Sequence, residues 1–348
     1  MARAITACRA LDELEVFRQA HSIHAAQQSF PTQRFIRTAG YGKTTVPYSQ
    51  KTTLFSPQVL DTNTRSHWLP ILCRTLAVLP LPALHATGRA LGRLVYALPG
   101  RYRQRLQENA AQAGYPDARF ARRSAGEAGA MILETCRIWF RNDDSIARVS
   151  CNDWDVIDTA RAEGKGILFL TPHLGSFEIT ARYVARRMPL TVMFRTPRKE
   201  YLRALMDSAR STSDLTAVPA SPQGVRAFMR ALRQGGAVGL LPDQAPSLGE
   251  GVWVPFFGRQ AFTMTLPGKL AAQAKVAVIL ASGERLPRGR GWRLHLMRLP
   301  DEMPDEPAAQ ATLLNGAMET LIRRFPEQYL WSYNRYKTPQ GAQPRPAE

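Results

Sequence analysis

The chain has 348 residues, and its 46 Lys and Arg against 28 Asp and Glu give a formal charge of +18 at pH 7. This length allows one large domain or two smaller ones, and a 45% hydrophobic content is ample for a core. The positive charge predicts an anionic partner, which can be nucleic acid, anionic lipid or a phosphorylated substrate. The four cysteines are scattered, without a CxxC pair or a Cys/His group at zinc spacing, so the sequence predicts free thiols and no metal site.

The first 64 residues carry the least pattern. From Gln27 to Thr64 the chain is rich in Ser, Thr, Gln and Pro and shows little periodicity. We expect residues 1–64 to form a partly disordered extension, and residues 339–348 a flexible tail.

An apolar stretch from Trp68 to Leu84 follows, at the lower limit of length for a helix that spans a bilayer. Three prolines and Arg74 interrupt it, and arginines recur from Arg89 to Arg105. Apolar residues flanked by arginine predict a helical membrane-associating region over 65–115, its basic side toward anionic headgroups. The alternative is a pair of buried core helices.

Residues 116–338 are expected to form an α/β domain. Residues 118–150 have a helical composition, and four strand candidates then alternate with helices. The strands are expected at 166–171, 190–194, 237–241 and 275–281, and the helices at 176–187, 199–213, 222–234 and 264–274. This alternation predicts a mainly parallel central sheet flanked by helices, with ligands bound beyond the carboxyl ends of the strands. No GxGxxG or P-loop signature occurs, so no nucleotide cofactor is expected.

The first of these strands ends at Thr171, and His173 and Glu178 follow. A spacing of five places two residues about 140° apart on a helix, so they meet only if Gly175-Ser176 bends the chain. With Ser176 as N-cap, the imidazole becomes a general base and the carboxylate its orienting partner. The alternative is a structural hydrogen bond from a strand-end histidine, beside a glutamate favoured by the helix dipole.

Polar residues also follow two further strands: Arg195 after 190–194, and Asp243-Gln244 after 237–241. Three strand ends with polar residues on one edge predict a polar site. Arg195 and Arg210 are candidates for binding phosphate or a developing oxyanion. Asp243 is expected to steady an arginine or orient a substrate, or else to cap a turn.

An aromatic loop, Val254-Pro255-Phe256-Phe257-Gly258, comes next. Phe256 and Phe257 can wall a channel for an alkyl chain or belong to the core. Thr263 can touch a substrate or cap a helix.

Taken in order, these segments resemble the late acyltransferases of lipid A biosynthesis, the lauroyl and myristoyl transferases of Gram-negative bacteria. His173-Leu174-Gly175-Ser176-Phe177-Glu178 matches the HxxxxE form of the HxxxxD/E acyltransferase box. The other matching segments are Tyr102-Arg103 with Asn109, Phe194-Arg195-Thr196-Pro197 with Arg210, Leu241-Pro242-Asp243-Gln244, Val254 to Gly258, and Pro326 to Trp331 with Arg335 and Lys337. The resemblance covers residues 68 to 337, and Phe194 stands where tyrosine is common.

The resemblance implies a glycerolipid-acyltransferase-like fold and an enzyme at the cytoplasmic face of the inner membrane, which holds anionic lipids. It implies transfer of a lauroyl- or myristoyl-class acyl chain from acyl carrier protein to a hydroxyl of a Kdo-lipid A precursor. His173 would be the base and Glu178 its partner. Substrate would bind Arg195, Arg210, Asp243, Gln244, Phe256, Phe257 and Thr263. No cofactor is required, because a thioester is already activated.

Two rival functions remain open at this point. A glycerophospholipid or lysophospholipid acyltransferase uses the same box, although with aspartate more often at the position of Glu178. A non-catalytic basic protein that binds membrane or nucleic acid would also account for the charge, but the basic residues are dispersed and no nucleic-acid motif is present.

Overall fold

A computed structural model describes residues 68–194, 205, 215–246, 250–274 and 276–346 of the chain. The predicted N-terminal extension, the helix expected at 199–213 apart from Leu205, and the side chains of Arg195 and Arg210 lie outside these ranges.

The core of the molecule is a seven-stranded sheet in the order β1-β9-β8-β2-β5-β3-β4. Its strands are β1 (Val149–Cys151), β2 (Ile167–Leu170), β3 (Leu190–Phe194), β4 (Leu215–Pro219), β5 (Ala237–Leu240), β8 (Ala277–Arg285) and β9 (Trp292–Arg298). Neighbouring strands are parallel except β8 and β9, which are antiparallel. The predicted α/β class with a mainly parallel sheet is confirmed.

Both faces of the sheet are covered, which explains why β2 is apolar without alternation. Leu168 and Leu170 point into a core shared with α10 (Pro222–Arg233), α11 (Leu266–Ala274) and α12 (Pro307–Ile322). Ile167 and Phe169 point the other way, into a core shared with α7 (Asp155–Ala162) and α8 (Phe177–Ala185). All four β2 residues are buried.

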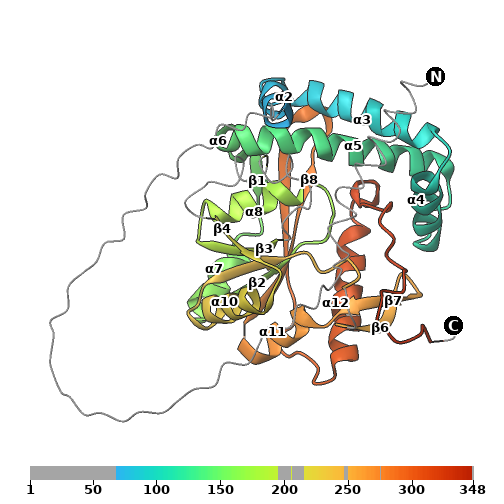
Figure 1. The fold of residues 1–348 in the computed structure, drawn as a ribbon. Helices are drawn as coiled ribbons and strands as arrows, with labels where there is room; N and C mark the ends of the chain where they lie inside the picture. The colour runs from blue at the N-terminus through green and yellow to red at the C-terminus, as the bar shows by residue number, and fades with distance from the viewer. Residues whose placement is uncertain (1–67, 195–204, 206–214, 247–249, 275, 347–348) are drawn as a thin grey trace, which may run out of the picture.

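A layer of helices lies across one end of the sheet, at the top of Figure 1. It consists of α2 (Trp68–Ala77), α3 (Leu81–Ala97), α4 (Arg101–Gln112), α5 (Ala118–Phe140) and the short α6 (Asn142–Ile146). Helices α3 and α5 pack with their main chains in close contact. Glycine at positions 88 and 92 allows this, because a Cβ atom at Gly88 or Gly92 would collide with main-chain atoms of α5. We call these five helices the helical layer.

Within the described ranges, no helix combines the length and hydrophobicity needed to cross a bilayer. The apolar stretch predicted at 68–84 is divided between α2 and α3, with the break at Val78–Pro80. The helical region expected over 118–150 is wrong at its end: α5 stops at Phe140, because Arg141 has non-helical backbone angles, the short α6 follows, and β1 begins at Val149.

A separate two-stranded hairpin, β6 (Gly251–Phe256) and β7 (Arg259–Met264), follows β5. Phe257 and Gly258 form its turn with φ of 48° and 76°, the left-handed region that tight hairpin turns require. Two side chains hold the turn: Glu319 accepts from the Phe257 N–H at 2.6 Å, and Gln112 donates to its carbonyl at 2.9 Å.

Candidate active site

His173 lies just beyond the carboxyl end of β2, in a turn docked on the neighbouring strand β8. Gly175 has φ of 62°, and a side chain there would collide with the Gly283 carbonyl. The Ser176 N–H donates to that same carbonyl at 2.7 Å. Ser176 occupies the N-cap position of α8 as expected, although its side chain makes no capping hydrogen bond. The bend predicted at Gly175-Ser176 therefore exists, and β8 fixes it.

The partner of His173 is Asp243, which follows the adjacent parallel strand β5. One carboxylate oxygen of Asp243 is 2.8 Å from His173 Nδ1, and the other accepts the His173 main-chain N–H at 2.8 Å. Two contacts to one residue fix the imidazole in both position and orientation. The predicted convergence of polar strand ends is confirmed for β2 and β5.

The hydrogen bonds also fix the tautomer of the neutral ring. An ionised carboxylate only accepts hydrogen bonds, so Nδ1 carries the proton and Nε2 presents its lone pair. The Gln244 side-chain amide lies 3.2 Å from Nε2, at the position where an incoming hydroxyl would donate. The imidazole packs edge-on against Phe177 with ring centroids 5.2 Å apart, and its side chain keeps 14% exposure. A general base requires an oriented imidazole of this kind with a lone pair on its outer nitrogen.

Asp243 is ionised although it is buried. Burial opposes the charged form, but the charge and hydrogen bonds of His173, together with the charge of Arg335, hold the pKa of this carboxyl below its ordinary value. An ionised Asp243 stabilises the imidazolium that forms when His173 takes a proton.

Glu178 lies in the first turn of α8, and its contacts differ from those predicted. It accepts from Trp139 Nε1 at 2.7 Å and lies 3.4 Å from Arg182 Nε, so it faces α5. The prediction that Glu178 orients His173 is wrong in its geometry, because Asp243 occupies that place on Nδ1. A catalytic role for Glu178 stays a prediction.

A profile of the bacterial lipid A biosynthesis acyltransferase family matches residues 52–338. The chain belongs to this family. It is therefore an acyltransferase, and the imidazole and carboxylate lie within the matched range.

Individual relatives agree with the family profile. The chain is 27% identical over 303 residues to a lipid A biosynthesis lauroyltransferase of Escherichia coli K12, covering 84% of this chain and 98% of the relative. It is 24% identical over 215 residues to the palmitoleoyltransferase of the same strain, covering 60% and 69%. A lipid A biosynthesis acyltransferase of Haemophilus influenzae is 24% identical over 307 residues, covering 83% and 96%.

The segment predicted as an aromatic loop is the end of β6 and the hairpin turn, and its two phenylalanine side chains are buried. Phe256 and Phe257 are 1% and 4% exposed, and the Arg335 guanidinium lies 5.1 Å from the centre of the Phe256 ring. Thr263 accepts from Arg335 Nη2 at 2.6 Å and from Asn315 at 3.2 Å. All these contacts are within the protein, and substrate binding by Phe256, Phe257 and Thr263 stays a prediction.

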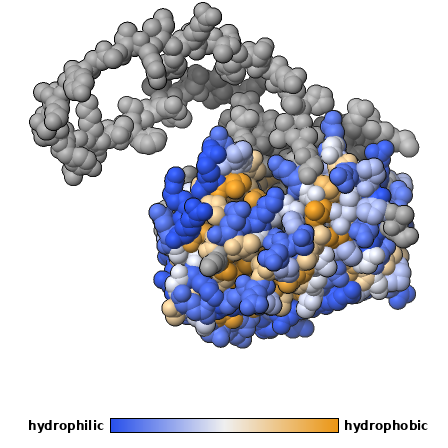
Figure 2. Space-filling view, turned by 90° about the horizontal axis from the view of Figure 1, so that it is seen from below, coloured by the Kyte–Doolittle hydropathy of each residue, from blue (hydrophilic) through white to orange (hydrophobic). Residues whose placement is uncertain are grey.

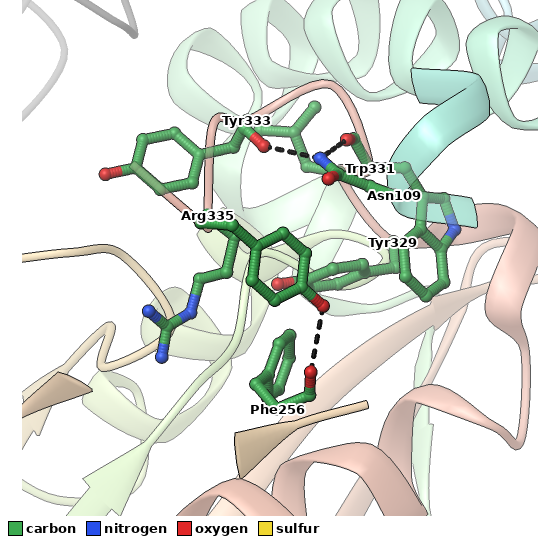
Figure 3. Close-up of a pocket in the computed structure, with 8 residues that line it drawn as sticks. Asn109, Phe256, Tyr329, Trp331, Tyr333 and Arg335 are labelled. Carbon is green, nitrogen blue, oxygen red and sulfur yellow. Dashed lines mark hydrogen bonds between the residues drawn. The ribbon is translucent and has the colours of Figure 1, made fainter. Parts of the chain in front are cut away.

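Two residues near Asp243 have no role in the sequence interpretation. Tyr329 and Arg335 are both buried, and both interact with the Asp243 carboxylate. They line a small pocket behind the base together with Asn109 and Tyr333 (Figure 3). The signal was present in the matching segment Pro326 to Arg335, but no spacing connects that segment to a residue about ninety positions earlier.

Proposed function

We propose that this acyltransferase moves a lauroyl- or myristoyl-class chain from acyl carrier protein to a hydroxyl on an acyl chain of a Kdo-lipid A precursor. The observation that carries the proposal is the partly exposed His173 held by buried Asp243, in a chain of this family. The relatives of the chain include a lauroyltransferase and a myristoyltransferase of Escherichia coli K12, which supports the substrate class.

The proposed reaction is a direct transfer. His173 Nε2 takes the proton of the acceptor hydroxyl as the oxygen attacks the thioester carbonyl, and Asp243 stabilises the imidazolium. The tetrahedral intermediate then collapses, the C–S bond breaks, and the imidazolium returns its proton to the leaving thiolate. A positioned base of this kind contributes about 10²–10⁴-fold to the rate. Arg195 and Arg210 stay candidates for binding phosphate or the oxyanion.

No covalent acyl-enzyme is required. Cys73 and Cys136 are buried against each other between α2 and α5, with their sulfur atoms 2.9 Å apart. Burial raises the pKa of the Cys151 thiol on β1, which makes it a poor nucleophile. Acyl transfer to any of these three thiols during turnover would contradict the proposal.

The experiment is a transfer assay with the full-length enzyme, purified Kdo-lipid A precursor and acyl carrier protein loaded with C12, C14 or C16:1 chains. We expect a product heavier by one C12 or C14 chain, and a loss of about 10²–10⁴-fold in kcat/KM for His173→Gln. Transfer to lysophospholipid but not to the precursor would favour the glycerolipid alternative. Full activity of His173→Gln would overturn the base assignment.

We also propose that the outer face of α2 and α3 binds the cytoplasmic side of the inner membrane. Within the described residues, every large hydrophobic side chain that is exposed lies in this region: Trp68, Ile71, Leu72, Val78, Leu79, Leu91, Leu94 and Leu98. A continuous apolar surface of this kind marks an interaction site. The exposed Arg93 and Arg101 lie beside it and suit anionic headgroups.

The position of this surface supports a lipid substrate. The carboxyl ends of β2 and β8 point toward the helical layer, and Trp139 of α5 donates to Glu178 at 2.7 Å. The base therefore lies under helices whose outer side is apolar. The opposite face of the molecule is mixed, with hydrophilic residues around smaller hydrophobic areas (Figure 2).

Vesicle sedimentation tests the membrane surface. With vesicles that contain anionic phospholipid, Leu94→Glu is expected to reduce the bound fraction several-fold, because it places a charge in the apolar face. Gln273→Glu, an exposed change of equal charge on α11, is the control and should bind like the parent. Equal binding of all three proteins would remove the proposal, and a change of oligomeric state for Leu94→Glu alone would indicate a protein partner instead.

A further inference from the structure

The segment Gln328–Arg335, which we call the C-terminal segment, runs past both halves of the His173–Asp243 pair. On the histidine side, its Leu330 N–H donates to the His173 carbonyl at 3.0 Å. The Gln328 carbonyl accepts from the Gly175 N–H, also at 3.0 Å. Tyr329 forms an isolated antiparallel bridge with Leu174. The turn that carries the base is thus held from both sides.

On the aspartate side, two tyrosines of the same segment lie beside the loop after β5. The Tyr333 hydroxyl accepts the main-chain N–H of Ala245 at 3.1 Å, two residues after Asp243. The Tyr329 phenol lies against Asp243 itself. Burial raises the pKa of Tyr329 well above its ordinary value, and the charge of Asp243 and a hydrogen bond to it act in the same direction. The phenol therefore stays protonated beside the carboxylate.

The C-terminal segment is itself anchored to the rest of the fold. Asn109 of α4 donates to the carbonyls of Trp331 and Tyr333 at 2.6 and 2.7 Å (Figure 3). Arg335 donates to the Phe262 carbonyl at 2.8 Å and to Thr263. The Asn109 amide and the Arg335 guanidinium thus fix a segment that lies against both members of the His173–Asp243 pair.

We propose that Tyr329 and Tyr333 are positioning residues, which set the distance and the proton affinity of the His173–Asp243 pair from behind. The proposal rests on the proposed function, since it assumes that His173 is the base. In this proposal Tyr329 and Tyr333 contact the pair and not the substrate. Asn109 holds the C-terminal segment, and with it both tyrosines, in place.

Each hydroxyl has a distinct expected effect. Without the Tyr329 hydroxyl, the Asp243 carboxylate loses a polar neighbour and interacts more strongly with the imidazolium. The acid limb of the kcat/KM profile should then move to higher pH. The other titratable groups that face Asp243 are His173 and Arg335, and both remain.

Without the Tyr333 hydroxyl, the Ala245 N–H loses its acceptor and the loop that carries Asp243 is free to shift. The structure offers a matched control in Tyr336, which lies in the same pocket and is buried to a similar degree. Its hydroxyl donates to the Phe256 carbonyl at 2.9 Å, away from the base. Tyr336→Phe therefore removes one buried hydroxyl without touching the pair.

The experiment compares Tyr329→Phe, Tyr333→Phe and Tyr336→Phe in the transfer assay between pH 5 and 9, with thermal unfolding of each protein. We expect the first two to lose about tenfold in kcat with little change in KM, because misplaced catalytic groups reduce the rate. Only Tyr329→Phe should move the acid limb upward. Tyr336→Phe should keep the parental kcat and pH profile, at a comparable loss of thermal stability.

The outcomes separate this inference from the proposed function. If His173→Gln is inactive while the Tyr329 and Tyr333 variants match Tyr336→Phe in kcat and pH profile, the C-terminal segment is only structural and the inference fails. If His173→Gln is fully active, the base assignment fails instead.

Discussion

Among the described residues, two histidine–carboxylate pairs have the same separation and different surroundings. His173 and Asp243 are 2.8 Å apart at the carboxyl ends of β2 and β5. His85 and Glu134 are also 2.8 Å apart, between α3 and α5 of the helical layer. The His85 and Glu134 side chains are fully inaccessible, whereas His173 keeps 14% exposure.

Glu134 has its acceptor capacity filled by other groups. Arg285 donates to both of its oxygens, at 2.6 and 2.8 Å, and Trp292 donates at 3.1 Å. Burial works against the charged form, but Arg285 and His85 outweigh it and lower the pKa of Glu134 to about 2. The comparison teaches that the pair alone does not make a base. Of the two, only the His173 pair keeps a partly exposed ring, which a base that meets a substrate requires.

The largest expected effect is on catalysis, from Asp243→Asn. The His173 main-chain N–H requires an oxygen at one position of the side chain, so the new amide NH₂ would face Nδ1 and force the proton to Nε2. The lone pair that accepts the substrate proton would be lost. We expect kcat to fall on the order of 10³–10⁴-fold with the fold intact, measured in the transfer assay and by circular dichroism.

The control for this variant is Asp301→Asn, a surface ion-pair residue near β9, which should keep kcat within about twofold. If both variants retain parental activity, Asp243 is a turn-capping residue, and the difference between the Asp243 and Glu134 pairs has no bearing on catalysis.

The second prediction concerns stability, from Glu134→Gln. The substitution leaves Arg285, which is fully buried, without its main counter-charge. Breaking one side of a buried pair costs about 3–5 kcal/mol in the free energy of unfolding. Denaturant unfolding measures this loss, and kcat per folded molecule should stay at the parental value.

A third histidine–glutamate pair provides the matched control for stability. His295 and Glu284 are 2.9 Å apart on the partly exposed side of β8 and β9. Glu284→Gln should cost less than about 1 kcal/mol, as exposed pairs do. Equal losses for Glu134→Gln and Glu284→Gln would show that burial does not distinguish the two pairs.

The pH dependence of stability follows from the same groups and gives a smaller effect. The pKa of Glu134 is depressed in the folded state, so its contribution is fully present above its ordinary value of 4.5 and is lost as pH falls toward about 2. Asp243 and Glu127, whose pKa values are also lowered, act in the same direction. We expect the unfolding temperature to fall with pH below about 4.5, and less steeply for Glu134→Gln than for the parent.

How far the sequence could predict the site depends on the range of the contacts. A buried strand followed by His173, and a second one followed by Asp243, predicted the correct edge of the sheet, because parallel strands place their carboxyl ends together. In the structure His173 contacts Asp243 and not Glu178, which is nearer in sequence. The sharp turn at Gly175 directs the helix, and with it Glu178, toward Trp139 instead.

No sequence pattern predicted the fully buried hydrogen-bond network of the helical layer. His85, Glu134 and Arg285 come from three distant segments, and no periodicity connects them. The strands β1, β4, β6, β7 and β9 were not predicted either. β9 pairs antiparallel with β8 and alternates in burial, which departs from the strand-helix alternation that identified β2, β3, β5 and β8. The apolar surface of α2 and α3, in contrast, follows directly from the composition of residues 68–98.

The smallest predicted effect separates Glu178 from Asp243. Glu178 contacts Trp139 and Arg182 and does not reach Nδ1 of His173. Glu178→Gln therefore keeps a hydrogen-bond acceptor for the indole and leaves the His173–Asp243 pair intact. We expect a loss of about tenfold in kcat/KM, roughly 1.4 kcal/mol, with the acid limb of the pH profile at the parental position. Asp243→Asn should lose far more under the same conditions. A loss for Glu178→Gln as large as that for Asp243→Asn, with a shifted acid limb, would mean that Glu178 turns toward His173 when substrate binds. In that case Glu178, as the sequence predicts, and not Asp243 would orient His173 during catalysis.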